Sequence, residues 1–240
     1  MNIIVTGATR GLGLEISKRL LAKGHTLYAV SRKRNDDFDA LVALFPNNLN
    51  FIPHNLSDIK GIKEAIFAKL VEDKVVIHGY VNNAAISYDD LLTNLNIDKL
   101  QEMINVNQIA PMVMTKYVIR NMLLHQTKGC IVHISSISAH TGFKGLSMYA
   151  STKGALEAYS KNTAREWGSL GIRSNCVVCG FMETDMTNMM TEDQKSKIHK
   201  RAALKDATDL GSVSDTVSFL LGDESKSITG QHIFVDGGVI

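Results

Sequence analysis

The sequence holds few of the residues that mark disulfide-bonded or metal-binding domains. Its three cysteines, Cys130, Cys176 and Cys179, are too few and odd in number for a disulfide framework. Cys176 and Cys179 form a CxxC motif, which leaves a redox or metal role open. The motif lies in an apolar, strand-like segment and has no second ligand pair. We therefore favour a packing role for both thiols and expect no metal site.

Long apolar runs and an excess of charge are also missing. No run approaches the roughly 20 residues of a membrane helix. The N-terminus, MNIIVTGATRG, has no basic lead typical of a signal peptide. A net charge of +2 argues against a nucleic-acid-binding surface, while 45% apolar residues suffice for a core. We expect a cytoplasmic protein that binds neither membrane nor nucleic acid.

Short apolar segments alternate with helix-like segments along the whole chain. In one of the latter, Leu14, Ile16, Leu20 and Leu21 recur at helical spacing. Strict alternation predicts a parallel sheet with right-handed crossovers. No linker or repeat interrupts it, so residues 1–240 are predicted to form one doubly wound Rossmann-type α/β domain, a seven-stranded parallel sheet with helices on both faces. The predicted strands span 2–5, 26–30, 49–52, 76–81, 129–134, 172–178 and 232–235.

A glycine-rich segment, TGATRGLGLE, follows the first predicted strand directly. Gly7, Gly11 and Gly13 fall in the turn and at the start of the next helix. Glycines permit a sharp bend and let a phosphate approach a helix N-terminus. The spacing is G-x-x-x-G-x-G, not the common G-x-G-x-x-G. We favour dinucleotide binding over simple turn geometry.

The second predicted strand ends in a basic segment, YAVSRKRND. An acidic residue there would bind the ribose 2′-hydroxyl of NAD. The chain instead places Ser31, Arg32 and Lys33 at this point, and Arg10 lies in the glycine loop. Cations suit a 2′-phosphate, so we expect NADP(H); the alternative is a solvated basic turn.

Amides and small residues follow the next two strands. Asn55 and Leu56 are expected to flank the adenine, and Asn82, Asn83 and Ala84 to lie beside the ribose. The same residues could equally form a turn whose asparagines cap a helix.

A tyrosine and a lysine stand four residues apart in the segment SMYASTKGAL. Residues i and i+4 share one helix face, so Tyr149 and Lys153 would point to the same place. Taken alone, the pair could share a solvated face by chance.

In combination, these motifs resemble the short-chain dehydrogenase/reductase family. The matching segments are TGATRGLG, NNAA, NVN at 105–107, SS at 135–136, YASTK at 149–153, CGFMETDM at 179–186 and the final ITGQHIFVDGG. The resemblance covers the whole chain. It implies a catalytic tetrad of Asn107, Ser136, Tyr149 and Lys153, and a homotetramer.

Each tetrad residue has a physical role to fill. A free phenol has a pKa of about 10, and a lysine cation one turn away favours the phenolate, so Tyr149 would act as general acid or base. Ser136 would position the carbonyl oxygen, and Lys153 would also reach the nicotinamide ribose. Pro111 removes the helical hydrogen bond to the Asn107 carbonyl, which could then bind water; an ordinary kink is the alternative.

The cofactor site implied by the motifs and the resemblance is extensive. Thr184 matches the residue that holds the carboxamide in the family. The predicted NADP(H)-binding residues are Gly7, Thr9, Arg10, Gly11, Leu12, Gly13, Ser31, Arg32, Asn55, Leu56, Asn83, Ala84, Ala85, Tyr149, Lys153, Gly180, Met182 and Thr184.

The substrate side is expected to be apolar. The family resemblance implies a lid, at about residues 181–207, over the nicotinamide and the substrate. Its methionines could form a flexible pocket or plain core. The predicted substrate residues are His140, Phe143, Phe181, Met186 and Met190.

Within the family, the chain looks closest to 3-oxoacyl-carrier-protein reductases. Such an enzyme would reduce a thioester-linked ketone, which an acyl carrier protein could present. The basic residues that would meet an acidic carrier are reduced to Lys128 and Arg173, and no proline follows the lid. The alternative is an alcohol dehydrogenase or ketoreductase for a sugar, polyketide or other small carbonyl. A non-catalytic nucleotide-binding regulator is more remote, because all four tetrad residues are present.

Overall fold

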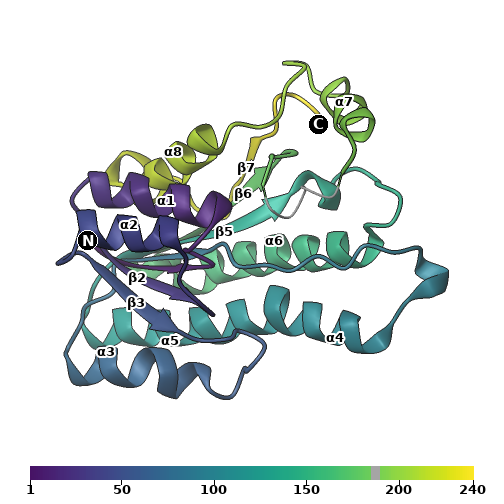
Figure 1. Ribbon diagram of the computed structural model, residues 1–240. Coiled ribbons are helices and arrows are strands. Elements are labelled where there is room, and N and C mark those ends of the chain that lie inside the picture. Colours follow the sequence, from purple (N-terminus) through teal and green to yellow (C-terminus); the bar gives the residue numbers. More distant parts are fainter. Residues whose placement is uncertain (185–189) are drawn as a thin grey trace.

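Seven strands lie side by side in one parallel sheet, which forms the middle layer of the molecule (Figure 1). The computed structural model describes residues 1–184 and 190–240. The strand order is β3-β2-β1-β4-β5-β6-β7. The bounds are β1 Asn2–Thr6, β2 Thr26–Ser31, β3 Leu49–Pro53, β4 Gly79–Asn82, β5 Gly129–Ser136, β6 Ile172–Cys179 and β7 His232–Val235. The predicted doubly wound α/β fold with seven parallel strands is confirmed.

Helices cover both faces of the sheet, as Figure 1 shows: α1, α2 and α8 on one face and α3 to α6 on the other. The α-helices are α1 Gly11–Ala22, α2 Asp36–Leu44, α3 Lys69–Glu72, α4 Ile97–Ile104, α5 Ala110–Leu124, α6 Ser147–Trp167, α7 Glu192–His199 and α8 Leu210–Leu221. Shorter 3₁₀ segments are η2 Leu92–Asn94, η4 Ile137–Ala139, η5 Gly168–Leu170 and η6 Asp223–Ser225. Two wide π-helical segments, η1 Lys63–Ala68 and η3 Asn105–Ile109, run into α3 and α5.

The alternation of side chains along each strand divides the core in two. Ile3 and Val5 of β1 join the cluster under α1, α2 and α8, whereas Ile4 joins the cluster under α3 and α5. In β5, Val132 and Ile131 divide in the same way. Because side chains alternate with a period of two, each apolar strand serves both helix layers.

The fourth strand is shorter than predicted. Residues 76 and 77 approach it without joining the ladder, because side-chain amides bind their backbone. The Ile77 N–H donates to Asn121 Oδ1 at 2.9 Å, and Asn2 Nδ2 donates to the Val76 carbonyl at 2.9 Å. Side-chain partners therefore replace the strand partners that the apolar pattern suggested.

The CxxC motif lies inside β6, where packing explains it. Cys176 and Cys179 are three residues apart, so they point to opposite faces of the strand. Both thiols are buried, and burial raises the pKa of each to about 12. Low thiolate character of this kind argues against a redox role.

The order of the strands places a switch point beside β1. This strand pairs with β2 on one side and with β4 on the other. Ligands of doubly wound sheets bind at the carboxyl ends of the strands near such a point. No helix in the described part of the chain is long and apolar enough to cross a bilayer.

Candidate active site

Tyr149 and Lys153 lie on one face of α6, near its N-terminal end. Helix α6 packs against β5 and β6. The Lys153 ammonium lies 5.5 Å from the centre of the Tyr149 ring. The spacing of four residues therefore brings the two groups together, in agreement with the sequence.

Lys153 is held by the end of the neighbouring strand. Its Nζ donates to the Ile134 carbonyl of β5 at 2.8 Å, and its side chain is almost completely buried. Burial lowers the pKa of Lys153 to about 8. The hydrogen bond to the Ile134 carbonyl holds the ammonium in one position beside the Tyr149 ring.

The pKa of Tyr149 moves in the direction opposite to the one predicted. Burial raises this pKa above its ordinary value, whereas the neighbouring lysine was expected to lower it. The reason is that removal of the phenol from solvent disfavours the charged phenolate, and Cys179 and Asp89 act in the same direction. In this arrangement, Tyr149 is a neutral phenol that can donate a proton.

Ser136 ends β5 with its side chain partly exposed. Its Oγ accepts two hydrogen bonds, one from the Ser138 N–H at 3.2 Å and one from Ser138 Oγ at 3.1 Å. Both bonds use the oxygen as acceptor. The Ser136 hydroxyl proton is used in neither bond, so this group can donate to a third partner.

Asn107 joins three segments that are distant in sequence. It is buried in the wide turn η3, exchanges two hydrogen bonds of 2.9 Å with the backbone of Ile86, and donates to Thr152 Oγ1 at 3.1 Å. Thr152 in turn donates to the Tyr149 carbonyl at 2.8 Å. The wide turn precedes Pro111, which has no N–H to continue the helical pattern. Sequence reasoning missed Thr152, although it lies inside the YASTK motif.

The glycine loop has a backbone conformation and close contacts that favour glycine. Gly7 and Gly11 have positive φ angles of 66° and 51°. A Cβ atom on Gly13 would lie 2.0 Å from the Gly7 carbonyl oxygen and 2.6 Å from Asn83 Nδ2. The helix can therefore begin this close to the strand end only with glycine at position 13.

A threonine and an asparagine tie the loop to the end of β4. Thr6 Oγ1 accepts from the backbone N–H groups of Asn83 and Ala84 at 3.1 and 3.2 Å. Asn83 Nδ2 donates to the carbonyls of Thr6 and Gly7 at 2.9 and 3.2 Å. The predicted residues Gly7, Asn83 and Ala84 thus meet at the switch point. Thr6 was not singled out, although it opens the TGATRGLG motif.

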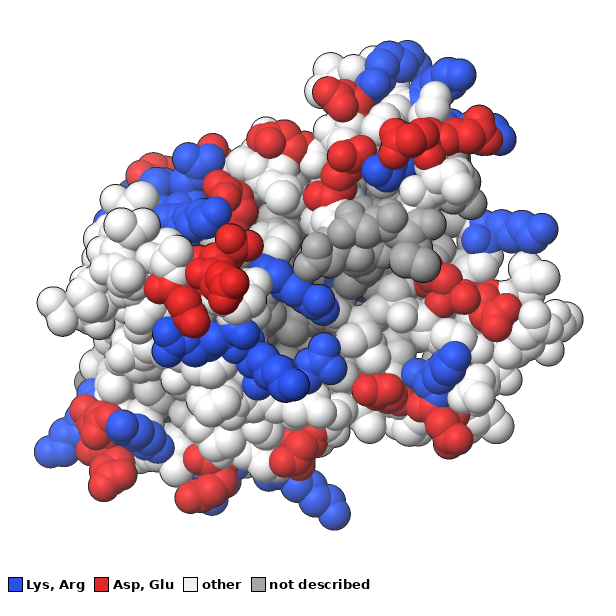
Figure 2. Space-filling view, in the orientation of Figure 1, with Lys and Arg blue, Asp and Glu red and all other residues white. Residues whose placement is uncertain are grey.

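Basic side chains border the same region. Figure 2 shows Lys and Arg side chains gathered around a hollow over the carboxyl ends of β2 and β3. Arg32 and Lys33 follow β2 directly and are exposed. Arg34 is ion-paired with Asp39, whereas Arg32 has no ion pair among the residues that the structure describes. Arg32 is therefore free to meet an anion.

The remaining cofactor positions border the same edge of the sheet. Leu56 is buried and Asn55 is exposed just after β3. The methyl group of Thr184 lies 3.7 Å from where a Cβ on Gly11 would stand, so the segment after β6 returns to the glycine loop. Thr9, Leu12, Ala85, Gly180 and Met182 are buried or partly buried.

The predicted substrate residues receive partners from α7 and the segment after it. Arg201 lies over the Phe143 ring at 4.6 Å, and the rings of Phe181 and His199 are 5.6 Å apart. The Thr208 N–H donates to the Phe181 carbonyl at 2.7 Å, which joins the two ends of the predicted lid. Met190 is partly buried, and Met186 lies outside the described residues.

His140, by contrast, is engaged elsewhere. Its Nε2 lies 2.9 Å from Glu157 Oε2, and its ring meets Phe234 at 4.8 Å between centroids. The histidine thus contacts α6 and β7, and Glu157 was not identified by sequence reasoning. No local pattern marks Glu157, because its partners are distant in the chain.

Comparisons with known proteins agree with this geometry. Residues 7–240 match a family model described as enoyl-(acyl carrier protein) reductase. The chain is 32% identical over 239 residues to the 3-oxoacyl-[acyl-carrier-protein] reductase FabG of Salmonella typhimurium, covering 98% of this chain and 96% of that protein. It is also 32% identical over 238 residues to an L-xylulose reductase of Caenorhabditis elegans, covering 98% and 94%.

Solved structures give the same result. A 4-hydroxyisoleucine dehydrogenase complexed with NADH superimposes with a TM-score of 0.93 at 26% identity, covering 99% of this chain and 98% of that one. A short-chain dehydrogenase from Burkholderia cenocepacia in complex with NADP gives 0.89 at 29% identity, covering 99% and 96%. The family match, the fold and the Tyr149–Lys153 pair together make this chain a member of the short-chain dehydrogenase/reductase family of oxidoreductases.

Proposed function

We propose that the protein interconverts a ketone and a secondary alcohol with NADP(H) as hydride donor or acceptor. The observation that carries the proposal is the pairing of Tyr149 with Lys153 beside Ser136 at the carboxyl end of β5. An acid, a fixed cation and a hydroxyl donor near one strand end support this reaction. A reduced nicotinamide bound there would supply the hydride.

The chain's own residues fit such a cofactor. The close approach at Gly7 and Gly13 leaves bare backbone at the N-terminus of α1, where phosphate oxygens bind favourably. Arg32 and Lys33 at the end of β2 suit a 2′-phosphate, and no acidic residue occupies that point. These residues favour NADP(H) over NAD(H).

Each catalytic residue then has one task. Tyr149 gives its phenol proton to the carbonyl oxygen as the alcohol forms, and burial keeps that phenol protonated until then. Ser136 donates its hydroxyl hydrogen to the same oxygen and holds it in place. Lys153 contributes positive charge next to the phenolate that remains. Asn107 and Thr152 position this part of α6.

A 3-oxoacyl thioester is the substrate that we put first. The curated relatives include several 3-oxoacyl-[acyl-carrier-protein] reductases at 30 to 32% identity. The apolar and aromatic side chains of Phe143, Phe181 and Met190 suit an acyl chain. Identity at this level supports the reaction class more strongly than the substrate.

Delivery by an acyl carrier protein is less well supported. Only two basic residues, Lys128 and Arg173, are expected to meet an acidic carrier protein. Arg173 donates to the carbonyls of Leu220, Gly222 and Ile228 at 2.8 to 3.2 Å. A guanidinium engaged in this way has few donors left for a partner. This observation favours the second candidate, a small free carbonyl substrate such as a sugar. The match to an L-xylulose reductase points the same way.

The proposal is tested by NADPH consumption with acetoacetyl thioesters on pantetheine and on carrier protein, and with L-xylulose as the free carbonyl. We expect fast turnover of at least one of them. Faster turnover of the carrier-bound thioester would establish carrier delivery, and turnover of the sugar alone would establish the second candidate. NADPH binding without turnover of any carbonyl would support the regulator instead.

Substitution of the acid tests the mechanism. We expect Tyr149→Phe to lower kcat by at least about a hundredfold, because the proton donor is gone. NADPH binding, measured by fluorescence, should persist because the glycine loop is intact. Normal turnover in this variant would refute the assignment of Tyr149.

A further inference from the structure

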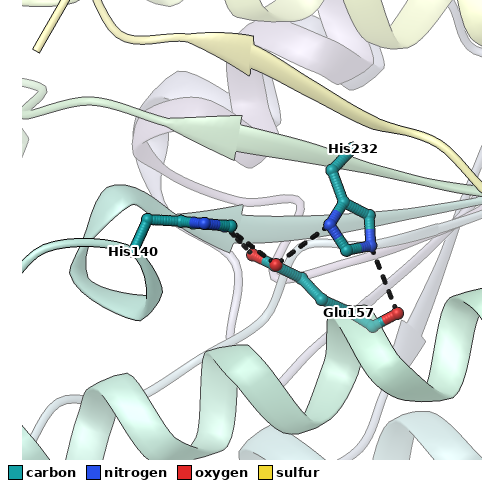
Figure 3. Close-up of side chains that lie close together, drawn as sticks. All are labelled: His140, Glu157 and His232. Carbon is teal, nitrogen blue, oxygen red and sulfur yellow. Dashed lines mark hydrogen bonds and ion pairs between the residues drawn. The ribbon is translucent and has the colours of Figure 1, made fainter. Parts of the chain in front are cut away.

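Outside the active site, one carboxylate lies between two histidines. Figure 3 shows His140 from the end of η4, Glu157 from α6 and His232 from β7 converging on one point, with the imidazoles on either side of the carboxylate. Glu157 Oε2 lies 2.9 Å from His140 Nε2 and 3.1 Å from His232 Nδ1. The three ligand atoms all lie within 4.8 Å of one another. We refer to these residues as the His-Glu-His cluster.

The hydrogen bonds around His232 indicate that a cation belongs between its Nδ1 atom and the Glu157 carboxylate. Its Nε2 lies 3.3 Å from the main-chain carbonyl of Glu157, which can only accept, so the ring proton belongs on Nε2. In the neutral ring, Nδ1 then carries a lone pair, and this lone pair faces the Glu157 carboxylate. Two acceptors at 3.1 Å repel one another unless a cation lies between them.

Neighbouring groups hold the His232 tautomer and the orientation of the Glu157 carboxylate that a metal ion requires. A metal-binding histidine commonly donates its other ring N–H to a carbonyl, as His232 does here. Ser135 Oγ donates to Glu157 Oε1 at 2.5 Å and orients the carboxylate. The carboxylate is buried, whereas 27% of the His140 side chain is exposed, which leaves a path from solvent.

We propose that the His-Glu-His cluster binds a zinc ion. Two imidazoles and one carboxylate form a ligand set that zinc accepts, with a water molecule as fourth ligand. Zinc ligands at about 2.0–2.1 Å in a tetrahedron lie about 3.3 Å from one another. The contacts of 2.9 and 3.1 Å on Glu157 need to open by a few tenths of an ångström. The two ring nitrogens, which lie within 4.8 Å of one another, need to reach the same spacing, and rotation of the partly exposed His140 ring would allow this.

The ion would stabilise the fold and take no part in the reaction. Its ligands come from η4, α6 and β7, so it would join three elements that meet only in the tertiary structure. Glu157 lies one turn beyond Lys153 on α6, and Ser135 precedes Ser136. The cluster therefore stabilises the parts of α6 and β5 next to the active site, without contacting the reacting groups.

The test is a zinc titration of the metal-free full-length protein against a chromophoric chelator. We expect one zinc ion per chain in the wild type and a melting temperature about 5 to 10 °C higher at a hundredfold excess over Kd. Glu157→Gln and His140→Ala should each weaken binding by at least about a hundredfold, since loss of even an outer partner costs about ten- to a hundredfold. His25→Gln, at a histidine remote from the cluster, should bind zinc as the wild type does.

A second readout keeps the test independent of stability. Cobalt in place of zinc should give the visible absorption of a tetrahedral nitrogen- and oxygen-ligated site in the wild type and in His25→Gln. His140→Ala removes a partly exposed side chain, and circular dichroism would verify that the variant is folded. If folded His140→Ala binds zinc as tightly as the wild type, or if the wild type binds none, the proposal is wrong. In that case a second ring proton, on Nδ1 of His232, supplies the positive charge beside Glu157.

Discussion

Burial of a single side chain, Lys153, has a measurable cost. Burial lowers the pKa of this ammonium from 10.5 to about 8, which corresponds to about 3 kcal/mol against folding below pH 8. In the unfolded chain the lysine holds its proton up to pH 10.5, whereas the folded chain releases it above about 8. The unfolded state therefore binds more protons in this window, and stability gains from rising pH.

This difference predicts the behaviour of Lys153→Met. We expect the variant to be more stable than the wild type by up to about 3 kcal/mol at pH 7, and the advantage should shrink between pH 8 and 10.5. Urea unfolding at several pH values measures it. A constant difference across this range would show that Lys153 is not buried as a charge.

Arg32 is expected to decide between the two nicotinamide cofactors. Removing a charge-assisted hydrogen bond to a phosphate costs about 1.5 to 3 kcal/mol, so Arg32→Ala should weaken NADPH binding by about ten- to a hundredfold. NADH binding should change little. Fluorescence titration with both cofactors gives the ratio.

The chain offers a matched control for this substitution. Arg34 belongs to the same basic segment, but it is ion-paired with Asp39. Arg34→Ala should therefore leave the preference for NADPH almost unchanged. Equal losses for both cofactors in Arg32→Ala would mean that another residue binds the phosphate.

At the scale of elements, the junction of β1 and α1 depends on the absence of one methyl group. A Cβ on Gly13 would lie 2.0 Å from the Gly7 carbonyl oxygen, so the helix would have to move away from the strand. We expect Gly13→Ala to lose about 1 to 3 kcal/mol of stability and to bind NADPH poorly. Chemical unfolding and fluorescence titration measure the two effects. Gly168→Ala is the control, since nothing lies within 4 Å of its Cβ position. If Gly13→Ala has the stability and NADPH affinity of the wild type, the packing at Gly13 is not as close as described.

The order of strands and helices was predictable from the sequence, whereas local irregularities within a helix were not. The seven strands follow from short apolar runs, because burial on both faces requires them to be apolar throughout. The wide turn at Asn105–Ile109 was not predicted as such. Its cause, Pro111, was identified, but the response of the helix to a proline depends on what packs around it. Here Asn107 is held by Ile86 and Thr152, which belong to other elements.

On the scale of the whole molecule, several apolar side chains remain exposed along η3 and α5. Ile109 and Met112 are 36% and 38% exposed, and the family resemblance implies a homotetramer. We expect light scattering to give four times the chain mass, and Met112→Glu to lower it, since a charge there disfavours burial between subunits. Leu44→Glu, on the 73% exposed Leu44 of α2, should leave the mass unchanged. A monomeric wild type would refute the tetramer.

Local patterns in the sequence determined the alternation of strands and helices, the glycines of the first turn and the spacing of Tyr149 and Lys153. These features depend on neighbours a few residues apart, and their periodicity is visible in the chain itself. The tertiary structure alone decided that Arg173 meets the Leu220 carbonyl and that Glu157 meets His140 and His232. Such partners are 17 to 75 residues apart in the chain and meet only because β5, β6 and β7 lie side by side, with α6 on one face of the sheet and α8 on the other. Side-chain packing between distant segments has no signature in local spacing. Such packing also buries Tyr149 and raises its pKa, whereas the sequence predicted a lowered pKa.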